Sequence, residues 1–204
     1  MSAPRVYCVL RQSTVYNVER VEWLRRQITD ADLFVIGDHV GANMPLLFGW
    51  PGWWSKLELC RPDIPGDVFF IDLDTVVLGP IVEFTRPRAT TFLSDFYRPA
   101  QLQSSVMYLT AADRAYIWQR WTTDPAGHIA NYATKRPGFN GDQNFMEAVL
   151  GQKVARWQDS PDTTPVCSYK VDMLGKGHVP LTGGLIVFHG KPRPWDVAGA
   201  PWNR

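Results

Sequence analysis

The sequence predicts a single α/β domain, residues 1–204, built on a mixed but mainly parallel sheet that is flanked by helices. Short apolar segments rich in β-branched and aromatic residues alternate with segments whose apolar residues recur at helical spacing. The chain opens with a strand, a helix and a second strand, at residues 5–10, 18–28 and 33–36, which is typical of crossover units between parallel strands. The 204 residues contain no internal repeat and no convincing linker, so one domain is expected.

The opening strand, helix and strand each carry a local signal. Residues 5–10 (RVYCVL) are β-branched, aromatic and apolar, as in a buried strand. Asn17 is an N-cap residue ahead of residues 18–28, whose apolar side chains approximate a helical stripe. Residues 33–36 (LFVI) form the second apolar run, which a Gly-Asp pair closes. Together they predict two strands joined by a crossover helix.

The rest of the chain predicts further strands and helices. A loop rich in Gly, Pro and Trp is expected over residues 41–52. Strands are expected at residues 68–71, 90–93, 105–109 and 184–188, and helices at residues 55–59, 111–121 and 141–150. Asp142 would lie in the first turn of the last of these helices, where a carboxylate favours the positive end of the helix dipole.

Composition and charge exclude several classes of function. The 21 basic and 20 acidic side chains leave a net charge of +1, which gives no electrostatic case for a broad nucleic-acid or membrane-surface face. Cys8, Cys60 and Cys167 are far apart and odd in number, so buried reduced thiols are expected. The N-terminal apolar run is too short for a signal sequence or a membrane span. We therefore expect a soluble, cytoplasmic protein.

The most specific local pattern is the segment VFFIDLDTVVLGP at residues 68–80. An apolar strand runs directly into Asp72 and Asp74, and the ligand sites of open α/β sheets lie at the carboxyl ends of strands. Two neighbouring carboxylates repel each other unless a cation lies between them or one is protonated. Oxygen donors without a nearby thiolate favour Mg²⁺ or Mn²⁺. A solvated turn with two exposed acids is the alternative that the bare pattern leaves open.

Two other functions are compatible with parts of the sequence. A strand that leads into two aspartates also opens the haloacid-dehalogenase-like phosphatases, but there the motif usually lies near the start of the chain, and here two expected strands precede it. A non-catalytic, Trp-rich carbohydrate-binding protein is the second alternative, because nine tryptophans offer stacking faces. Trp50, Trp53 and Trp54 could stack on an acceptor sugar or pack against each other, and packing is favoured for at least two of them.

The segment HGKPRPW at residues 189–195 follows the last expected strand. The imidazole of His189 is a suitable third ligand for Mn²⁺, and Lys191 and Arg193 could neutralise phosphate oxygens. The prolines stiffen the segment and hold both cationic side chains on an extended backbone. With the two aspartates, these residues predict a clamp for a metal ion and a diphosphate.

Together the two motifs resemble those of the GT-A fold nucleotide-sugar transferases, most closely glycosyltransferase family 8, which includes glycogenin and bacterial lipooligosaccharide galactosyltransferases. In that family an apolar strand leads into DxD, and a late strand leads into an H-x-x-G-x-x-K-P-W-like segment. The resemblance implies a Rossmann-like GT-A fold and a Mn²⁺ or Mg²⁺ ion held by Asp72, Asp74 and His189. It places Lys191 on the donor diphosphate, although Gly190 directly follows His189 and the segment is shorter than in the family. It further implies a nucleoside-diphosphate sugar, a UDP-sugar, as donor and transfer with retention of configuration.

Other segments occur in the order that the family shows. Lys56 lies in the short helix ahead of DxD, whose basic residue approaches the diphosphate in the family. Asp142 and Gln143, in FNGDQ at residues 139–143, resemble the family's D-Q element, which contacts the donor sugar or the reacting centre. Ser105 lies in the place of an N-S/A-G-V segment that lines the site, with serines in place of its Asn and Gly. The resemblance therefore spans nearly the whole chain.

Three further residues are expected near the donor. Asp95 follows an expected strand and precedes aromatics; it is either a turn cap or a site residue. As a site residue, Asp95 or Asp142 would stabilise positive charge on the reacting carbon, or serve as general base if the enzyme inverts. Arg11 and Tyr16 follow the first strand, where the family holds uracil, and the ring of Tyr16 suits stacking on a base. The expected acceptor is a saccharide or another hydroxyl compound; the balanced charge favours this over a hydroxylated DNA base.

Overall fold

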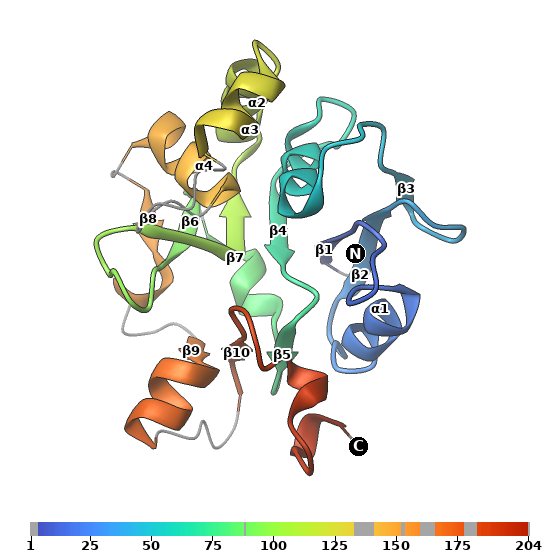
Figure 1. The fold of residues 1–204 in the computed structure, drawn as a ribbon, viewed down its shortest axis with the longest axis vertical. Coiled ribbons are helices and arrows are strands. Elements are labelled where there is room, and N and C mark those ends of the chain that lie inside the picture. The colour runs from blue at the N-terminus through green and yellow to red at the C-terminus, as the bar shows by residue number, and fades with distance from the viewer. Residues whose placement is uncertain are drawn as a thin grey trace.

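A seven-stranded sheet with the strand order β3-β2-β1-β4-β7-β6-β8 forms the centre of the protein (Figure 1). The computed structural model describes residues 4–87, 89–132, 141–151, 154–159, 166–177 and 183–203. The strands of this sheet are Arg5–Leu10 (β1), Asp32–Gly37 (β2), Met44–Pro45 (β3), Val68–Ile71 (β4), Thr91–Ser94 (β6), Leu102–Leu109 (β7) and Ala155–Arg156 (β8). Strand β7 is antiparallel to both its neighbours, whereas the other described pairs are parallel. The predicted mixed, mainly parallel sheet is therefore confirmed.

A smaller sheet with the order β5-β10-β9 lies below the large one in Figure 1. Its strands are Thr75–Val77 (β5), Val166–Ser168 (β9) and Leu185–Val187 (β10). Strand β10 runs antiparallel to β5 and parallel to β9. Because β5 follows β4 almost directly, residues 72–74 connect the two sheets.

Helices cover both faces of the large sheet. The longer ones are α1 (Val18–Arg25), α2 (Ala111–Trp121), α3 (Pro125–Tyr132), α4 (Asp142–Leu150) and the 3₁₀ helix η1 (Gly52–Cys60). The shorter ones are η2 (Val82–Thr85), η3 (Trp157–Asp159), the π-helical η4 (Tyr169–Leu174), η5 (Pro194–Asp196) and η6 (Pro201–Asn203). In Figure 1 the C-terminal residues, coloured red, lie beside β5.

Strand β4 is buried on both faces, so its alternate side chains enter two different cores. Phe69 and Ile71 pack in the core that contains Val21 and Leu24 of α1. Val68 and Phe70 pack in a second core with side chains of three helices, among them Leu57 of η1, Trp121 of α2 and Phe145 of α4. A strand that is apolar at every position suits such a doubly covered sheet. This double burial fixes the end of β4 and the aspartates that follow.

Several predicted elements have their expected bounds. The strands at residues 5–10 and 68–71 and the helix at residues 111–121 are confirmed as predicted. Asn17 caps α1 as predicted, since its side-chain oxygen accepts the N–H of Arg20 at 3.3 Å. The helix ends at Arg25 rather than at residue 28, because the backbone tightens there and the N–H of Ile28 donates to the carbonyl of Arg25 at 3.2 Å.

The other predicted elements are present with shifted ends, and several short elements were not predicted. The expected strands at residues 90–93, 105–109 and 184–188 correspond to β6, β7 and β10, and the expected helices at residues 55–59 and 141–150 to η1 and α4. Strands β3, β5, β8 and β9 contain two or three residues each, too few for a periodic pattern. Helix α3 has no fully buried side chain, and of its eight residues the apolar Ile129 and Tyr132 are partly buried against the second core.

The cysteines behave as structural side chains. Cys8, Cys60 and Cys167 are buried and form no disulfide, as expected. Burial raises the pKa of each thiol to about 12, so all three remain protonated at neutral pH. In the part of the chain that the structure describes, no helix combines the length and apolar character needed to cross a membrane.

Candidate functional site

Asp72 and Asp74 lie where β4 ends, in a turn that backbone hydrogen bonds fix. The N–H of Asp72 donates to the carbonyl of Ser105 on β7 at 2.8 Å, and the N–H of Thr75 donates to the carbonyl of Asp72 at 3.1 Å. The Asp74 side chain is 5% exposed and that of Asp72 is 22% exposed. The two carboxylates are therefore enclosed by the protein, and the alternative of a solvated turn with exposed acids is not what the structure shows.

The pairing of the smaller sheet brings the C-terminal motif to this turn. Strand β10 is antiparallel to β5, and Val187 lies opposite Thr75. The residues that follow Val187 therefore run back past Asp74. This register explains how Arg193, more than a hundred positions along the chain, reaches Asp74 after β4.

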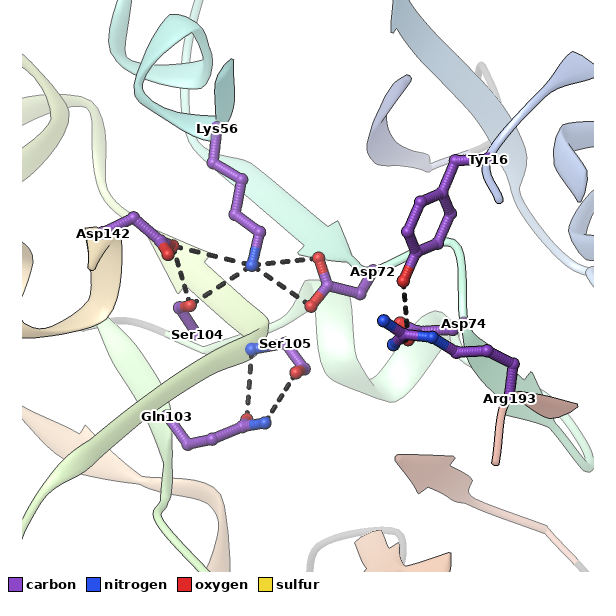
Figure 2. A network of polar contacts seen from close by, with 9 residues as sticks. All are labelled: Tyr16, Lys56, Asp72, Asp74, Gln103, Ser104, Ser105, Asp142 and Arg193. Carbon is purple, nitrogen blue, oxygen red and sulfur yellow. Dashed lines mark hydrogen bonds and ion pairs between the residues drawn. The ribbon is translucent and has the colours of Figure 1, made fainter. Parts of the chain in front are cut away.

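Lys56 links the first aspartate to the D-Q element (Figure 2). Its ammonium nitrogen lies 3.0 and 3.1 Å from the two carboxylate oxygens of Asp72 and 3.6 Å from Oδ2 of Asp142. The ammonium also donates to Oγ of Ser104 at 3.2 Å, and that hydroxyl donates to Asp142 at 2.9 Å. Residues from η1, the end of β4, β7 and α4 thus meet in one network.

The ammonium of Lys56 and the carboxylates of Asp72 and Asp142 form one network of opposite charges. Burial opposes the charge on Lys56, but Asp142 and Asp72 outweigh it and raise the pKa of the ammonium. Burial raises the pKa of Asp142, and the charge of Lys56 opposes that rise. The ammonium is therefore charged at neutral pH and stabilises two carboxylates at once.

A second cation lies on Asp74. The guanidinium of Arg193 contacts Oδ2 of Asp74, and the hydroxyl of Tyr16 donates to the same oxygen at 3.0 Å (Figure 2). The Arg193 guanidinium also lies over the ring of Tyr16, 5.2 Å from its centroid. Tyr16 is also the residue expected to stack on a base, and in this structure its hydroxyl holds the second aspartate.

The negative charge of Asp72 destabilises the ionised form of Asp74. Burial and the charge of Asp72 raise the pKa of Asp74 to about 6, against the opposing charge of Arg193. Burial and the charge of Asp74 in turn raise the pKa of Tyr16, so its hydroxyl stays a proton donor. A cation that reached both carboxylates would relieve this repulsion.

His189 lies beside a cavity rather than against the aspartates. Its Nε2 forms a 2.6 Å hydrogen bond with Oγ of Ser168 on β9. Its ring stacks on Phe96, with centroids 5.8 Å apart, and meets the ring of Tyr97 edge-on. Burial and the charge of Lys170 lower the pKa of the imidazole, so its neutral form is favoured.

The cavity next to His189 has a volume of about 220 Å³ and contains three of the predicted site residues. It is lined by Asp95, Phe96, Tyr97, Arg98, Gln103, Gln143 and His189. Asp95 accepts the backbone N–H groups of Tyr97 and Arg98 at 2.8 Å each, so it is a turn cap and a cavity residue at once. Gln143 donates to the carbonyl of Leu102 at 2.9 Å.

The structure places other predicted residues at the edge of the site. Arg11 pairs with Asp38 at 3.5 Å and donates to Oγ of Ser55 at 3.1 Å, so it braces the loop before η1. Ser105 accepts a 2.6 Å hydrogen bond from Gln103. Lys191 is exposed, and it has no polar contact within the described residues. Of the two cationic residues in the C-terminal motif, Arg193 is thus the one that reaches the aspartates.

Of the three tryptophans before DxD, two pack against other aromatic rings and one is largely exposed. Trp54 is buried and stacks on Trp121, with centroids 5.3 Å apart. Trp50 stacks on Phe48 at 4.4 Å. Trp53 is 59% exposed and lies against Gly141, directly before the D-Q pair. The favoured hypothesis, packing for at least two of the three, is confirmed.

Sequence reasoning missed two polar partners in the site. Ser168 holds His189, but it belongs to β9, a three-residue strand without a detectable pattern. Gln103 lines the cavity, and the sequence could have predicted its place. It lies two positions before Ser105 on the same strand, and alternate residues of a strand share a face. Of the predicted FNGDQ segment, residues 139 and 140 lie outside the described residues.

The two aspartates fit a hard divalent cation, although a three-ligand site is not assembled. Both offer carboxylate oxygens, and each already attracts a cationic side chain, Lys56 or Arg193. His189 is engaged with Ser168 instead. Within the described residues, no three side chains of His, Cys, Asp or Glu are arranged to hold a metal ion. Of the three predicted metal ligands, Asp72 and Asp74 therefore lie at one turn, whereas His189 lines the cavity.

The fold is shared with solved glycosyltransferases. The apo-form glycosyltransferase GlyE of Streptococcus pneumoniae TIGR4 superposes with a TM-score of 0.64 at 10% identity, over 96% of this chain and 56% of that one. The galactosyltransferase LgtC, in complex with donor and acceptor sugar analogues, gives 0.58 at 9% identity, over 94% and 89%. The bifunctional WbbM gives 0.56 at 11% identity, over 99% and 50%. The chain spans just over half the length of GlyE.

Sequence comparison alone does not find these likenesses. No protein-family model matches the chain, and no curated protein matches it. At about one identity in ten, the structural neighbours show the fold, which is the GT-A fold that the motifs predicted. The polar network at the carboxyl end of β4 lies where open α/β sheets bind ligands.

Proposed function

We propose that the protein transfers a sugar from a nucleoside-diphosphate sugar, a UDP-sugar, to a hydroxyl group of a saccharide acceptor, with retention of configuration. One observation carries the proposal: two aspartates at the end of a buried strand, each paired with a cation, within a fold shared with glycosyltransferases. Such a cluster can hold a diphosphate through charge and leave the adjacent cavity for sugar.

The residues around the aspartates suit the departure of a diphosphate. Breaking the bond between the anomeric carbon and the phosphate oxygen builds negative charge on the leaving group. Arg193 and Lys56 are placed to stabilise that charge, and preorganised charges of this kind act where the transition state needs them. A Mn²⁺ or Mg²⁺ ion held by Asp72 and Asp74 would supply Lewis-acid stabilisation of the leaving group.

The cavity residues suit the sugar side of the reaction. Asp142 and Gln143 begin α4; Asp142 contacts Lys56 at 3.6 Å, and Gln143 lines the cavity together with Asp95. The carboxylates of Asp142 and Asp95 already accept contacts, from Lys56 and Ser104 in one case and from backbone N–H groups in the other. Carboxylates held in this way can stabilise positive charge on the reacting carbon, and retention itself is proposed from the resemblance of the motifs to a family that retains configuration.

The alternative functions have less support. The likeness to glycosyltransferases covers between 94% and 99% of the chain, which favours a transferase over the haloacid-dehalogenase-like phosphatase. A purely carbohydrate-binding protein has no use for the buried charges on Asp74 and Asp142. Burial raises the pKa of both carboxylates, and carboxylates perturbed in this way cluster at functional sites, which supports chemistry on a charged ligand.

Thermal unfolding with ligands tests the proposal. UDP and Mn²⁺ together should raise the melting temperature more than either alone, because both bind only the folded protein and each strengthens the binding of the other. A ligand present at 100 times its Kd stabilises the folded state by about 2.7 kcal/mol. Asp74→Asn should abolish the joint shift. Glu83→Gln, at an exposed carboxylate of η2 outside the site, should keep it. The proposal fails if no nucleoside diphosphate or nucleotide sugar stabilises the protein with either metal ion.

A further inference from the structure

The contact between Arg193 and Asp74 has a consequence for how the donor binds. Under the proposed function, Asp74 is a ligand of the divalent cation, yet the guanidinium of Arg193 lies on its Oδ2. We propose that Arg193 is an exchange residue. It pairs with Asp74 when no donor is bound, and it moves to the donor diphosphate when the cation takes its place on the carboxylate. This inference rests on the proposed function.

The backbone around Arg193 is held independently of Asp74. The N–H of Arg193 donates to the carboxylate of Asp196 at 2.9 Å, and Pro194 is buried. The carbonyl of Pro194 accepts hydrogen bonds from the indole of Trp202 at 3.1 Å and from Asn203 at 2.9 Å. The segment thus keeps its position when the guanidinium leaves.

Trp195 anchors the same segment against α1. Its ring meets those of Tyr16 and Trp23 edge-on, with centroids 5.9 Å apart in both pairs. The guanidinium of Arg20 lies over it at 4.4 Å. Aromatic contacts of this kind stabilise the segment through burial, without any contribution from the charge on Arg193. The Arg193 side chain, 21% exposed, can therefore move while its backbone stays in place.

The charges give the exchange its direction. A divalent cation and a guanidinium on one carboxylate repel each other, so Arg193 opposes the binding of the cation alone. A diphosphate adds negative charge, and a guanidinium binds phosphate oxygens strongly through paired hydrogen bonds. Once the diphosphate is present, Arg193 has a better partner and no longer competes. Cation and diphosphate therefore bind cooperatively, and each tightens the other by the same factor.

Lys56 does not take part in this exchange. Its ammonium contacts both oxygens of Asp72, the carboxylate of Asp142 and the hydroxyl of Ser104, and its side chain is 11% exposed. Moving it would leave Asp72 and Asp142 without a compensating positive charge. The exchange is thus confined to the half of the site that contains Asp74.

Binding measurements on Arg193→Gln test the inference. Mn²⁺ affinity is measured without nucleotide, from the electron paramagnetic resonance signal of free Mn²⁺, and UDP affinity by calorimetry at saturating Mn²⁺. Arg193→Gln should bind Mn²⁺ alone about tenfold more tightly and UDP with Mn²⁺ about tenfold more weakly, within the range of measured coupling factors. A lost structural anchor would not produce opposite effects on the two ligands.

Two further variants separate charge from structure. Arg193→Lys keeps the positive charge, so it should bind Mn²⁺ alone as weakly as the wild type. Arg86→Gln removes an arginine that also pairs with a carboxylate, Glu83 at 2.7 Å, but on the surface, and it should match the wild type in both measurements.

Several outcomes would overturn the inference, and they differ from failure of the proposed function. An unchanged or weaker Mn²⁺ affinity in Arg193→Gln would overturn the exchange, and so would equal Mn²⁺ affinities for the Lys and Gln variants. If UDP and other nucleoside diphosphates never bind, the proposed function fails. Tighter binding of Mn²⁺ alone by Arg193→Gln would still support the competition at Asp74, because that measurement contains no nucleotide.

Discussion

Lys56 and Arg193 each place a positive charge on one of two neighbouring aspartates, but their surroundings differ. Lys56 contacts Asp72, Asp142 and Ser104, and its side chain is only 11% exposed. Arg193 contacts a single carboxylate and is 21% exposed. The first half of the site is therefore fixed before any ligand arrives, whereas the second half has a cation that can leave. A site for a charged donor can use both halves. The half around Lys56 holds its groups in position, and the half around Arg193 rearranges when the donor binds.

Removal of Lys56 should have the largest effect on stability. Lys56→Met keeps most of the side-chain volume but leaves Asp72 and Asp142 without their shared cation. Breaking a buried ion pair from one side leaves an uncompensated charge, so the free energy of unfolding should fall by about 3 kcal/mol. Equilibrium unfolding in urea measures this loss.

The same measurement on Arg193→Gln supplies the contrast. Its partner Asp74 keeps the hydrogen bond from Tyr16, and the guanidinium is partly exposed, so the loss should be about 1 kcal/mol or less. Equal losses for the two variants would show that the two halves are held with similar strength. That result would contradict the distinction between a fixed half around Lys56 and a responsive half around Arg193.

Replacement of Asp142 should affect transfer more than stability. Asp142→Asn keeps the side-chain shape, and Lys56 retains both oxygens of Asp72, so the unfolding free energy should change by about 1 kcal/mol at most. The loss of a negative charge near the reacting carbon should reduce kcat about 100-fold, as for other preorganised electrostatic groups. Steady-state transfer assays with a UDP-sugar measure it.

Asp63→Asn is the matched control for that variant. Asp63 also pairs with a cation, Arg61 at 2.8 Å, but away from the site, so kcat should equal that of the wild type. If Asp142→Asn transfers sugar at the wild-type rate, Asp142 has no role in the reaction and only completes the Lys56 network.

The sequence predicts the fixed half of the site better than the responsive half. The strand at residues 68–71 is apolar at every position and ends at Asp72, so strand, burial and carboxylate could all be read locally. Helices with clear N-terminal signals, such as the cap at Asn17, were also predictable. These features depend on neighbours in the chain, which is why a single sequence reveals them.

Long-range pairings explain what the sequence could not predict. The contact between Lys56 and Asp142 requires η1 and α4 to lie on the same side of β4, and no local pattern encodes that. The choice of Arg193 over Lys191 depends on the register between β5 and β10, which is set by strands of three residues. Ser168, the partner of His189, comes from a similarly short strand.

The anchor of the responsive half gives the smallest predicted effect. Trp195→Leu removes the edge-on contacts with Tyr16 and Trp23, each of a kind that contributes about 0.5–1.5 kcal/mol. Amide hydrogen exchange at residues 193–203 should accelerate about tenfold, because this segment opens locally, while exchange in β4 stays unchanged. Trp53→Leu, at an indole that is 59% exposed, should leave exchange in residues 193–203 unaffected. Acceleration in β4 as well would mean that the C-terminal segment unfolds together with the core, and Arg193 would then lack the independent support that its exchange requires.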